Sequence, residues 1–209
     1  MNILNNYCFI YDFKKVFFIN FFIFISYKTS FYKITIFLSI LMIFIYFFYR
    51  IPVNNPQINK QFIYAPSYGI IKNIEKTNGF LHIAIFIRLH DPHIQYIPYS
   101  GFLSNILYKP GEFNPAYVIK KGKYNEKMIY YINTYRGNII VSQISGVLAR
   151  SIIPFVKEKT TVKQNEELGL IKFGSRCDIF IPLSNSLKIL VKPGDYVQGS
   201  YTKLIKFLN

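Results

Sequence analysis

GFLHIAIFIRL, residues 79–89, is the stretch that decides the fold class. It is short and rich in isoleucine and phenylalanine, and a turn with histidine, aspartate and proline follows it, which is typical of a β-strand. Similar runs, among them HIQYIPYSGFL, GNIIVSQISG and LKILVKPG, recur along the chain between glycines, prolines and asparagines. Short strands at regular spacing predict a mainly β protein with a single compact domain, folded as a sandwich or barrel.

The N-terminal 50 residues have a different texture. Two apolar runs, VFFINFFIFISY (16–27) and ITIFLSILMIFIYFFY (34–49), flank the segment KTSFYK. A spanning helix needs roughly 20 residues, and the second run reaches that length when residues 31–33 join it and Lys33 extends to the headgroups. We expect one transmembrane helix, with two as the alternative, and an N-terminally anchored membrane protein whose side of the membrane is open.

The domain boundaries follow from this change in texture. Two prolines and three asparagines within residues 51–60 break any periodic pattern. We therefore assign 1–50 to a membrane anchor, 51–63 to a linker and 64–209 to the β domain.

Net charge and cysteine content limit the classes of binding partner, disulfide and metal site that we expect. The net charge is +15, and a basic face beside a bilayer meets acidic headgroups first, so anionic membrane lipids are expected partners. No recognised nucleic-acid motif accompanies the charge, so no nucleic acid is expected. Cys8 and Cys177 lack CxxC spacing and are too few for a disulfide framework, and no metal site is expected.

A weak repeat lies near the C-terminus. Val-Lys, then Val, then Leu-Ile-Lys-Phe occurs in residues 156–173 and again in 191–207. Each copy resembles the small hammerhead barrels that display a residue on a tight turn, as biotinyl and lipoyl carriers do. The turns of the carrier proteins, Met-Lys-Met and Asp-Lys-Ala, are absent, which speaks against a carrier lysine. The first copy leads directly into Gly174-Ser175.

HDPH, residues 90–93, crowds an acid and two imidazoles at a proline-set turn between two strands. A histidine there can titrate near neutrality and act as acid or base. The alternative to a catalytic turn is an ordinary surface loop, because strand-to-strand turns favour Asp and Pro. His82 alternates with apolar neighbours and is interpreted as structural.

Five segments, in order, resemble motifs of the phosphatidylserine decarboxylases, and the match runs from about Tyr64 to Leu204. They are FIRLHDPHIQYIP (86–98), YKPGEFNPA (108–116), NE (125–126), QISGVLAR (143–150) and GLIKFGSR (169–176). The last segment is similar to the self-cleavage site of the family's shorter members.

The resemblance implies a pyruvoyl-dependent carboxy-lyase that is made as a zymogen. Ser175 would attack the carbonyl of Gly174, the chain would split there, and a pyruvoyl group would replace Ser175; His93 matches the histidine that serves as base. This group would form a Schiff base with phosphatidylserine, and phosphatidylethanolamine would result as CO2 leaves. Arg150, Lys172 or Arg176 would hold the substrate's phosphate or carboxylate.

The chain departs from the family pattern at one position. The family has serine-proline-x-aspartate-glycine where this chain has APSYG (65–69), so Tyr68 replaces the acid that orients the histidine, a loss that can be severe. Asp91 substitutes for it, or Tyr68 suffices for a cleavage that happens once per molecule, or the chain does not mature. The last case gives the alternative function, a non-catalytic, membrane-tethered β domain that binds anionic lipid. Further expected partners are the two cleavage chains for each other, with a homodimer left open.

Overall fold

The computed structural model describes most of the chain, and two compact units, Met1–Pro52 and Val53–Asn209, divide it. The described residues are 17–28, 31–48, 50–52, 58–147, 151–171, 175–184 and 186–208, with residues 45–48 described by their backbone alone. Cys8 and Gly174 lie outside these segments.

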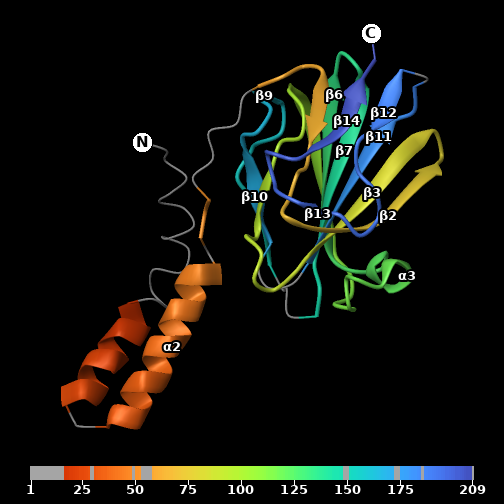
Figure 1. Cartoon of the computed structure of the whole chain (residues 1–209). Helices are drawn as coiled ribbons and strands as arrows, with labels where there is room; N and C mark the ends of the chain where they lie inside the picture. Colours follow the sequence, from red (N-terminus) through yellow and green to blue (C-terminus); the bar gives the residue numbers. More distant parts are fainter. Residues whose placement is uncertain are drawn as a thin grey trace. The chain divides into compact units, whose positions relative to one another are not determined.

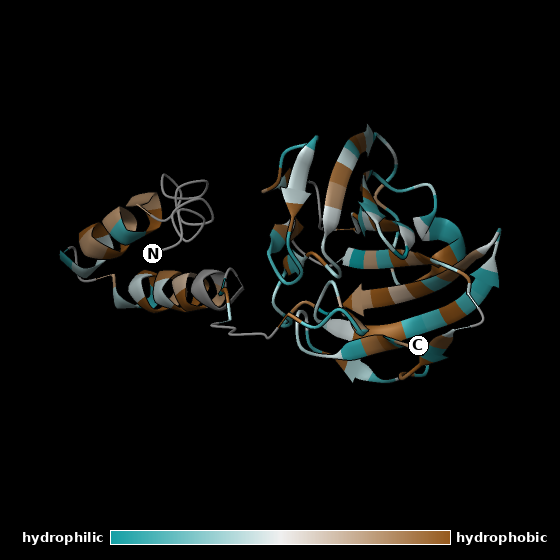
Figure 2. Cartoon of the chain, turned by 90° about the horizontal axis from the view of Figure 1, so that it is seen from above, coloured by the Kyte–Doolittle hydropathy of each residue, from teal (hydrophilic) through white to brown (hydrophobic). Residues whose placement is uncertain are grey.

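The described part of the N-terminal unit contains two apolar helices, residues 17–28 and α2 (Tyr32–Phe48), which run side by side in opposite directions (Figure 1). The hydroxyls of Ser26 and Thr35 lie 2.8 Å apart and join them. Most residues along the two ribbons are hydrophobic, with a few polar ones between them (Figure 2), and the exposed side chains include Phe17, Phe37 and Ile43.

The predicted transmembrane helix is not confirmed. Within the described segments, no helix combines the length and the apolar character that crossing a membrane requires. α2 has 17 residues and is therefore about 26 Å long, against a hydrocarbon core of about 30 Å.

The second unit is built on an open eight-stranded sheet with the order β13-β2-β3-β11-β7-β6-β5-β9. All of its pairings are antiparallel. The strands are β2 (Gly69–Thr77), β3 (Phe80–Ile87), β5 (Gly101–Lys109), β6 (Lys127–Thr134), β7 (Gly137–Ile144), β9 (Thr160–Val162), β11 (Ser175–Pro182) and β13 (Tyr196–Val197).

Two three-stranded sheets, β1-β14-β12 and β4-β10-β8, complete the unit. Their strands are β1 (Phe62–Tyr64), β4 (Ile94–Tyr96), β8 (Ile152–Pro154), β10 (Glu167–Ile171), β12 (Leu187–Ile189) and β14 (Lys203–Phe207), and a short helix, α3 (Ile119–Gly122), lies between β5 and β6.

The mainly β prediction is confirmed, whereas the barrel alternative is wrong. Among the described strands, β13 and β9 are the ends of the large sheet and do not pair with each other. The physical reason is their length: each has only two or three residues, after which the chain turns into one of the small sheets and cannot continue the large one.

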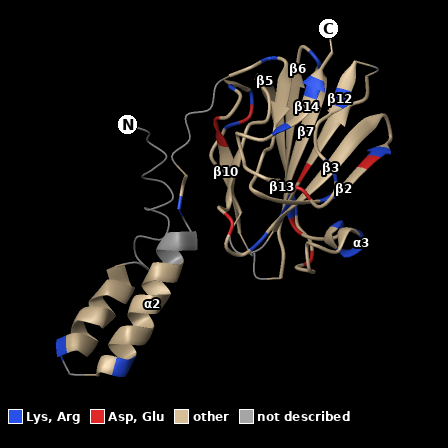
Figure 3. Ribbon diagram, viewed as in Figure 1, with Lys and Arg blue, Asp and Glu red and all other residues tan. Residues whose placement is uncertain are grey.

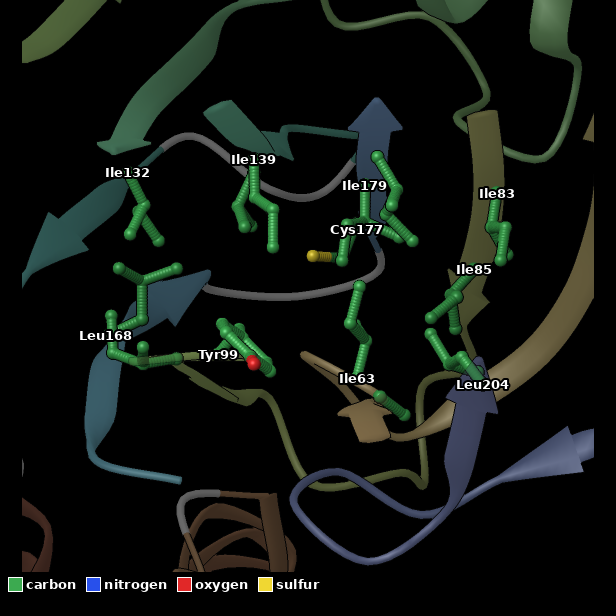
Figure 4. Close-up of a cluster of buried hydrophobic side chains, with 14 of the residues drawn as sticks. Ile63, Ile83, Ile85, Tyr99, Ile132, Ile139, Leu168, Cys177, Ile179 and Leu204 are labelled. Carbon is green, nitrogen blue, oxygen red and sulfur yellow. The ribbon is translucent and has the colours of Figure 1, made fainter. Parts of the chain in front are cut away.

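One hydrophobic core joins the three sheets. Ile83 and Ile85 of β3 alternate into it because successive strand residues point to opposite faces, and they meet Leu204 of β14 and Ile63 of β1 (Figure 4). Leu168 of β10 belongs to the same cluster. The small sheets therefore pack on the large one in the manner of a sandwich.

The C-terminal repeat has a structural counterpart. β8–β9–β10 and β12–β13–β14 are equivalent units: in each, the third strand pairs with the first, and the middle strand joins one end of the large sheet. The duplication extends further than the sequence analysis found. Tyr64 N donates to Pro98 O at 3.2 Å, and Tyr96 N donates to Pro66 O at 2.8 Å, so APSYG and IPYSG occupy matching places.

Candidate active site

The strand register brings the motif-bearing segments to one end of the large sheet, where its central strands begin or finish. Ser175, the first residue of β11, pairs with Ile87 at the end of β3, and Arg176 pairs with Ile144 at the end of β7. β6 begins and β5 finishes at the same end. Three segments therefore emerge at the end of the sheet where Ser175 lies: the HDPH turn after β3, the loop between β5 and β6, and the segment after β7.

Ser175 is fully buried. Among the residues that the structure describes, its Oγ has no hydrogen-bond partner. Leaving a buried hydroxyl unpaired costs about 1–3 kcal/mol, and such groups are rare outside sites of chemistry or strain. This orphaned oxygen fits the precursor of a pyruvoyl group, because a serine that must react cannot be held by a competing acceptor.

His93 is also fully buried, and its ring is oriented by the main chain. Nδ1 lies 2.6 Å from the carbonyl oxygen of Asp91. A carbonyl oxygen only accepts hydrogen bonds, so Nδ1 carries the proton, and the neutral ring then has its lone pair at Nε2. The carbonyl of His93 in turn accepts from Ile171 N at 3.2 Å, which fixes the histidine beside the strand that leads toward Ser175.

A chain of hydrogen-bonded, buried side chains ends on the main-chain carbonyl of His93. The sequence analysis did not predict it. Gln95 Nε2 donates to the carbonyl oxygen of His93 at 2.9 Å, and Gln143 Nε2 donates to Gln95 Oε1 at 2.5 Å. The hydroxyl of Tyr130 donates to Gln143 Oε1 at 2.5 Å. All four residues are inaccessible to solvent. The glutamine at the start of QISG was the available signal.

Asp91 does not use its carboxylate on the imidazole of His93. Arg88 donates to it from Nε at 2.9 Å and from Nη2 at 2.8 Å, and the Tyr196 hydroxyl donates at 3.2 Å. Burial alone would raise the pKa of Asp91, but the hydrogen bonds from Arg88 outweigh it and hold this pKa below its ordinary value. The carboxylate thus fixes the turn, and the main-chain oxygen reaches the ring. His90 is exposed, with Nε2 4.0 Å from Asp91 Oδ1.

The comparison with known proteins decides the family. A family model described as phosphatidylserine decarboxylase matches residues 42–204. The chain belongs to the phosphatidylserine decarboxylase family. The phosphatidylserine decarboxylase proenzyme of Pelagibacter ubique is 33% identical over 178 residues, which is 80% of this chain and 81% of that protein. The proenzyme of Streptomyces griseus is 32% identical over 143 residues, 68% of this chain and 65% of that protein. The family expected from the motifs is confirmed, and it is a family of enzymes.

Tyr68 stands where the decarboxylase pattern has its aspartate, and the structure buries it. Its ring meets that of Tyr96 edge to face, with 6.4 Å between the ring centroids, and the two side chains are hydrogen bonded. Burial raises the pKa of Tyr96, and Tyr68 adds to this. The next residue must be glycine, because Gly69 has a φ of 145° and a Cβ would collide with the main-chain oxygen of Phe86.

Arg176 is buried within a network of charges rather than exposed to a substrate. Its guanidinium donates to Asp178 at 2.8 and 3.0 Å and to the carbonyl oxygen of Ala116 at 3.2 Å. His82 lies behind, with Nε2 3.2 Å from Asp178 and Nδ1 3.0 Å from Glu75. Its buried position in β3 agrees with the structural role predicted for it.

The remaining predicted residues lie outside the described segments. Gly174, on the acyl side of the expected scissile bond, is one of them, and Arg150 and Lys172 are the others. Of the predicted residues that are described, Ser175, His93 and Asp91 lie at the same end of the large sheet.

Proposed function

We propose that this protein is a membrane-bound phosphatidylserine decarboxylase that cleaves itself between Gly174 and Ser175 and carries a pyruvoyl group derived from Ser175. The observation that carries the proposal is the buried Oγ of Ser175, which has no hydrogen-bond partner among the described residues, at the end of the sheet where His93 is held with its proton on Nδ1. The family membership and the names of the relatives support the substrate, phosphatidylserine, and the product, phosphatidylethanolamine.

The cleavage uses the chain's own residues. His93 Nε2 accepts the proton of the Ser175 hydroxyl while Oγ attacks the carbonyl carbon of Gly174, and the amide becomes an ester. Removal of the α-proton of Ser175 expels the ester oxygen from Cβ, so Gly174 leaves as a carboxylate. The remaining enamine tautomerises to an imine, and water replaces its nitrogen, which departs as ammonia.

In decarboxylation the pyruvoyl ketone supplies an electron sink. The protein supplies position and protons. His93, desolvated and fixed by the glutamine chain, can take up a proton at Nε2 and deliver it to the carbon from which CO2 departs. Lys172 and Arg150 are the proposed partners of the substrate phosphate or carboxylate, since Arg176 is committed to Asp178.

The substrate is a lipid, and the N-terminal unit fits attachment to a bilayer. Its two helices expose phenylalanine and isoleucine side chains, among them Phe18, Phe22 and Ile40. Burying such side chains in lipid contributes about 1.5–3 kcal/mol each. We assign membrane attachment to this unit.

A second function is favoured by Tyr68, which provides no negative charge for an imidazolium. It is a non-catalytic β domain, tethered to the membrane, that binds anionic lipid without cleavage. One measurement separates the two: a denaturing gel with the intact mass of the purified protein. The decarboxylase yields a fragment of residues 175–209 that is one ammonia lighter than the peptide beginning with serine, and Ser175→Ala stays whole. A single uncut wild-type chain would establish the non-catalytic domain.

A further inference from the structure

The loop between β5 and β6, at the end of the large sheet where β11 begins, carries a basic and aromatic surface. An open recess of about 660 Å³ is lined by Lys120, Lys121, Lys123 and Tyr124, together with Asn114 and one carboxylate, Glu112, to which Asn114 Nδ2 donates. Figure 3 shows the blue residues of α3 at this end of the sheet. Large aromatic side chains are exposed around it. We call this surface the α3 platform; its aromatic members are Tyr108 (51% exposed), Phe113 (40%), Tyr117 (56%) and Tyr124 (59%).

The platform is rigidly held, although its side chains face solvent. Asn125 is fully buried, and its Nδ2 donates to the carbonyl oxygens of Asn114 at 2.7 Å and of Ser145 at 2.8 Å. The main-chain N of Asn114 donates back to Asn125 Oδ1 at 2.9 Å. The backbone of the loop is therefore fixed from within, and exposure of the aromatic rings is a property of its folded state.

The platform is tied to the residue next to the expected scissile bond. Arg176 Nη1 donates to the carbonyl oxygen of Ala116 and, at 3.5 Å, to that of Ile119 in α3. Gly122 gives the guanidinium room, since a Cβ there would lie 2.8 Å from Nη1. The platform is thus fixed to the side chain of Arg176, the residue that follows Ser175, on the face of β11 opposite to the Ser175 side chain.

We propose that the α3 platform docks the β domain onto the surface of an anionic bilayer. Lysines beside exposed tyrosines and a phenylalanine suit the headgroup region, where ammonium groups meet lipid phosphates and amphipathic rings lie at the boundary with the acyl chains. Lys123 Nζ already lies 4.8 Å from the centroid of Tyr124, so charge and ring act together. The surface belongs to the β domain itself, and the inference rests on the proposed function only in that the bilayer would hold the lipid substrate.

The chain provides a sensitive test because it contains no tryptophan. Full-length Tyr124→Trp is reconstituted into vesicles of phosphatidylcholine, alone or mixed with phosphatidylglycerol, containing lipid brominated near the headgroup. We expect quenching and a blue shift of the tryptophan emission in the anionic vesicles, both reversed by salt. The control is Leu183→Trp, which follows β11 at the opposite end of the sheet and is exposed; it should not be quenched.

The lysines are tested by replacing Lys120, Lys121 and Lys123 with glutamine in the Tyr124→Trp background. Each lysine near an anionic surface is worth about fivefold in binding, so the ratio of docked to undocked protein should fall by up to about 100-fold. Replacing Lys76, Lys188 and Lys206 removes the same charge elsewhere and should leave quenching unchanged.

Three results would overturn the inference: no quenching at position 124, equal quenching in neutral vesicles, or a response to single-stranded RNA but not to vesicles. The Ser175→Ala chain separates the inference from the proposed function. Docking should persist in that variant, whereas a protein that cleaves itself normally and fails to dock would refute the platform alone.

Discussion

Nδ1 of His93 lies 2.6 Å from the main-chain carbonyl oxygen of Asp91, while the carboxylate of Asp91 is occupied by Arg88 and Tyr196. A main-chain oxygen holds the imidazole tautomer without a full negative charge. We propose that this contact partly compensates for the missing aspartate at Tyr68, and this compensation should survive substitution of the Asp91 side chain.

Asp91→Asn should keep self-cleavage and lose stability. The carbonyl that orients His93 remains, so we expect a cleavage rate within about tenfold of wild type. In serine proteases, where the carboxylate of the triad orients the histidine, the same Asp→Asn change lowers the rate roughly 10⁴-fold. The weaker bonds to Arg88 should cost about 1–3 kcal/mol in the free energy of unfolding. Time courses on gels and urea titrations measure the two effects. His93→Gln, the control, should remain uncut; a 10⁴-fold slower Asp91→Asn would mean that the carboxylate orients the ring.

Gln143→Leu should slow cleavage, although Gln143 touches neither Ser175 nor substrate in the described contacts. The change leaves Tyr130 and Gln95 without their shared partner, at about 1–3 kcal/mol for each buried polar group, and loosens the hold on His93. Tyr130→Phe is the matched control, because it breaks the far end of the chain and leaves the bond from Gln95 to His93. Cleavage is compared well below both melting temperatures. Equal rates in the two variants would argue against a positioning role.

Arg176 and Asp178 should behave as a buried ion pair. Arg176→Met leaves the Asp178 carboxylate without its bidentate partner and should lower the free energy of unfolding by about 3–5 kcal/mol. Adding Asp178→Leu should recover most of that loss, because the uncompensated carboxylate is removed and His82 keeps its contact with Glu75. Urea unfolding of the two single variants and the double variant closes the cycle. If the two effects simply add, Arg176 and Asp178 are not coupled as an ion pair.

His82 should make stability depend on pH. Burial alone would lower its pKa, but the carboxylates of Asp178 and Glu75 overcome this and raise the pKa above the ordinary 6.5. A raised folded-state pKa stabilises the protein below pH 6.5, and this contribution disappears as the pH rises through the folded value.

Melting curves from pH 6 to 9 test this. As the pH rises, the melting temperature of the wild type should fall by about 2–4 °C for each kcal/mol of unfolding free energy that His82 ceases to contribute. His82→Gln should remove this part of the pH dependence. A slope unchanged in His82→Gln would assign the pH dependence to other groups.

Local patterns in the sequence predicted much of this protein. Alternation in 79–89 predicted β3, since side chains of a strand alternate whatever the strand pairs with. Gly174-Ser175 and His93 were singled out by their resemblance to motifs of the family, and their catalytic roles stay a prediction. The repeat near the C-terminus was visible, whereas its relation between APSYG and IPYSG emerged only from the reciprocal hydrogen bonds of Tyr64 and Tyr96.

The sequence by itself therefore determined the mainly β class, the apolar N-terminus and the motifs that identify the family. Only the tertiary structure decided that the sheet stays open, that Asp91 serves His93 through its main chain, that Gln95 and Gln143 support the histidine, and that Arg176 is bound to Asp178. The physical reason is that these contacts depend on the register of strands distant in the chain. Ser175 pairs with Ile87 across 88 positions, and no local pattern specifies which buried donor will meet which acceptor.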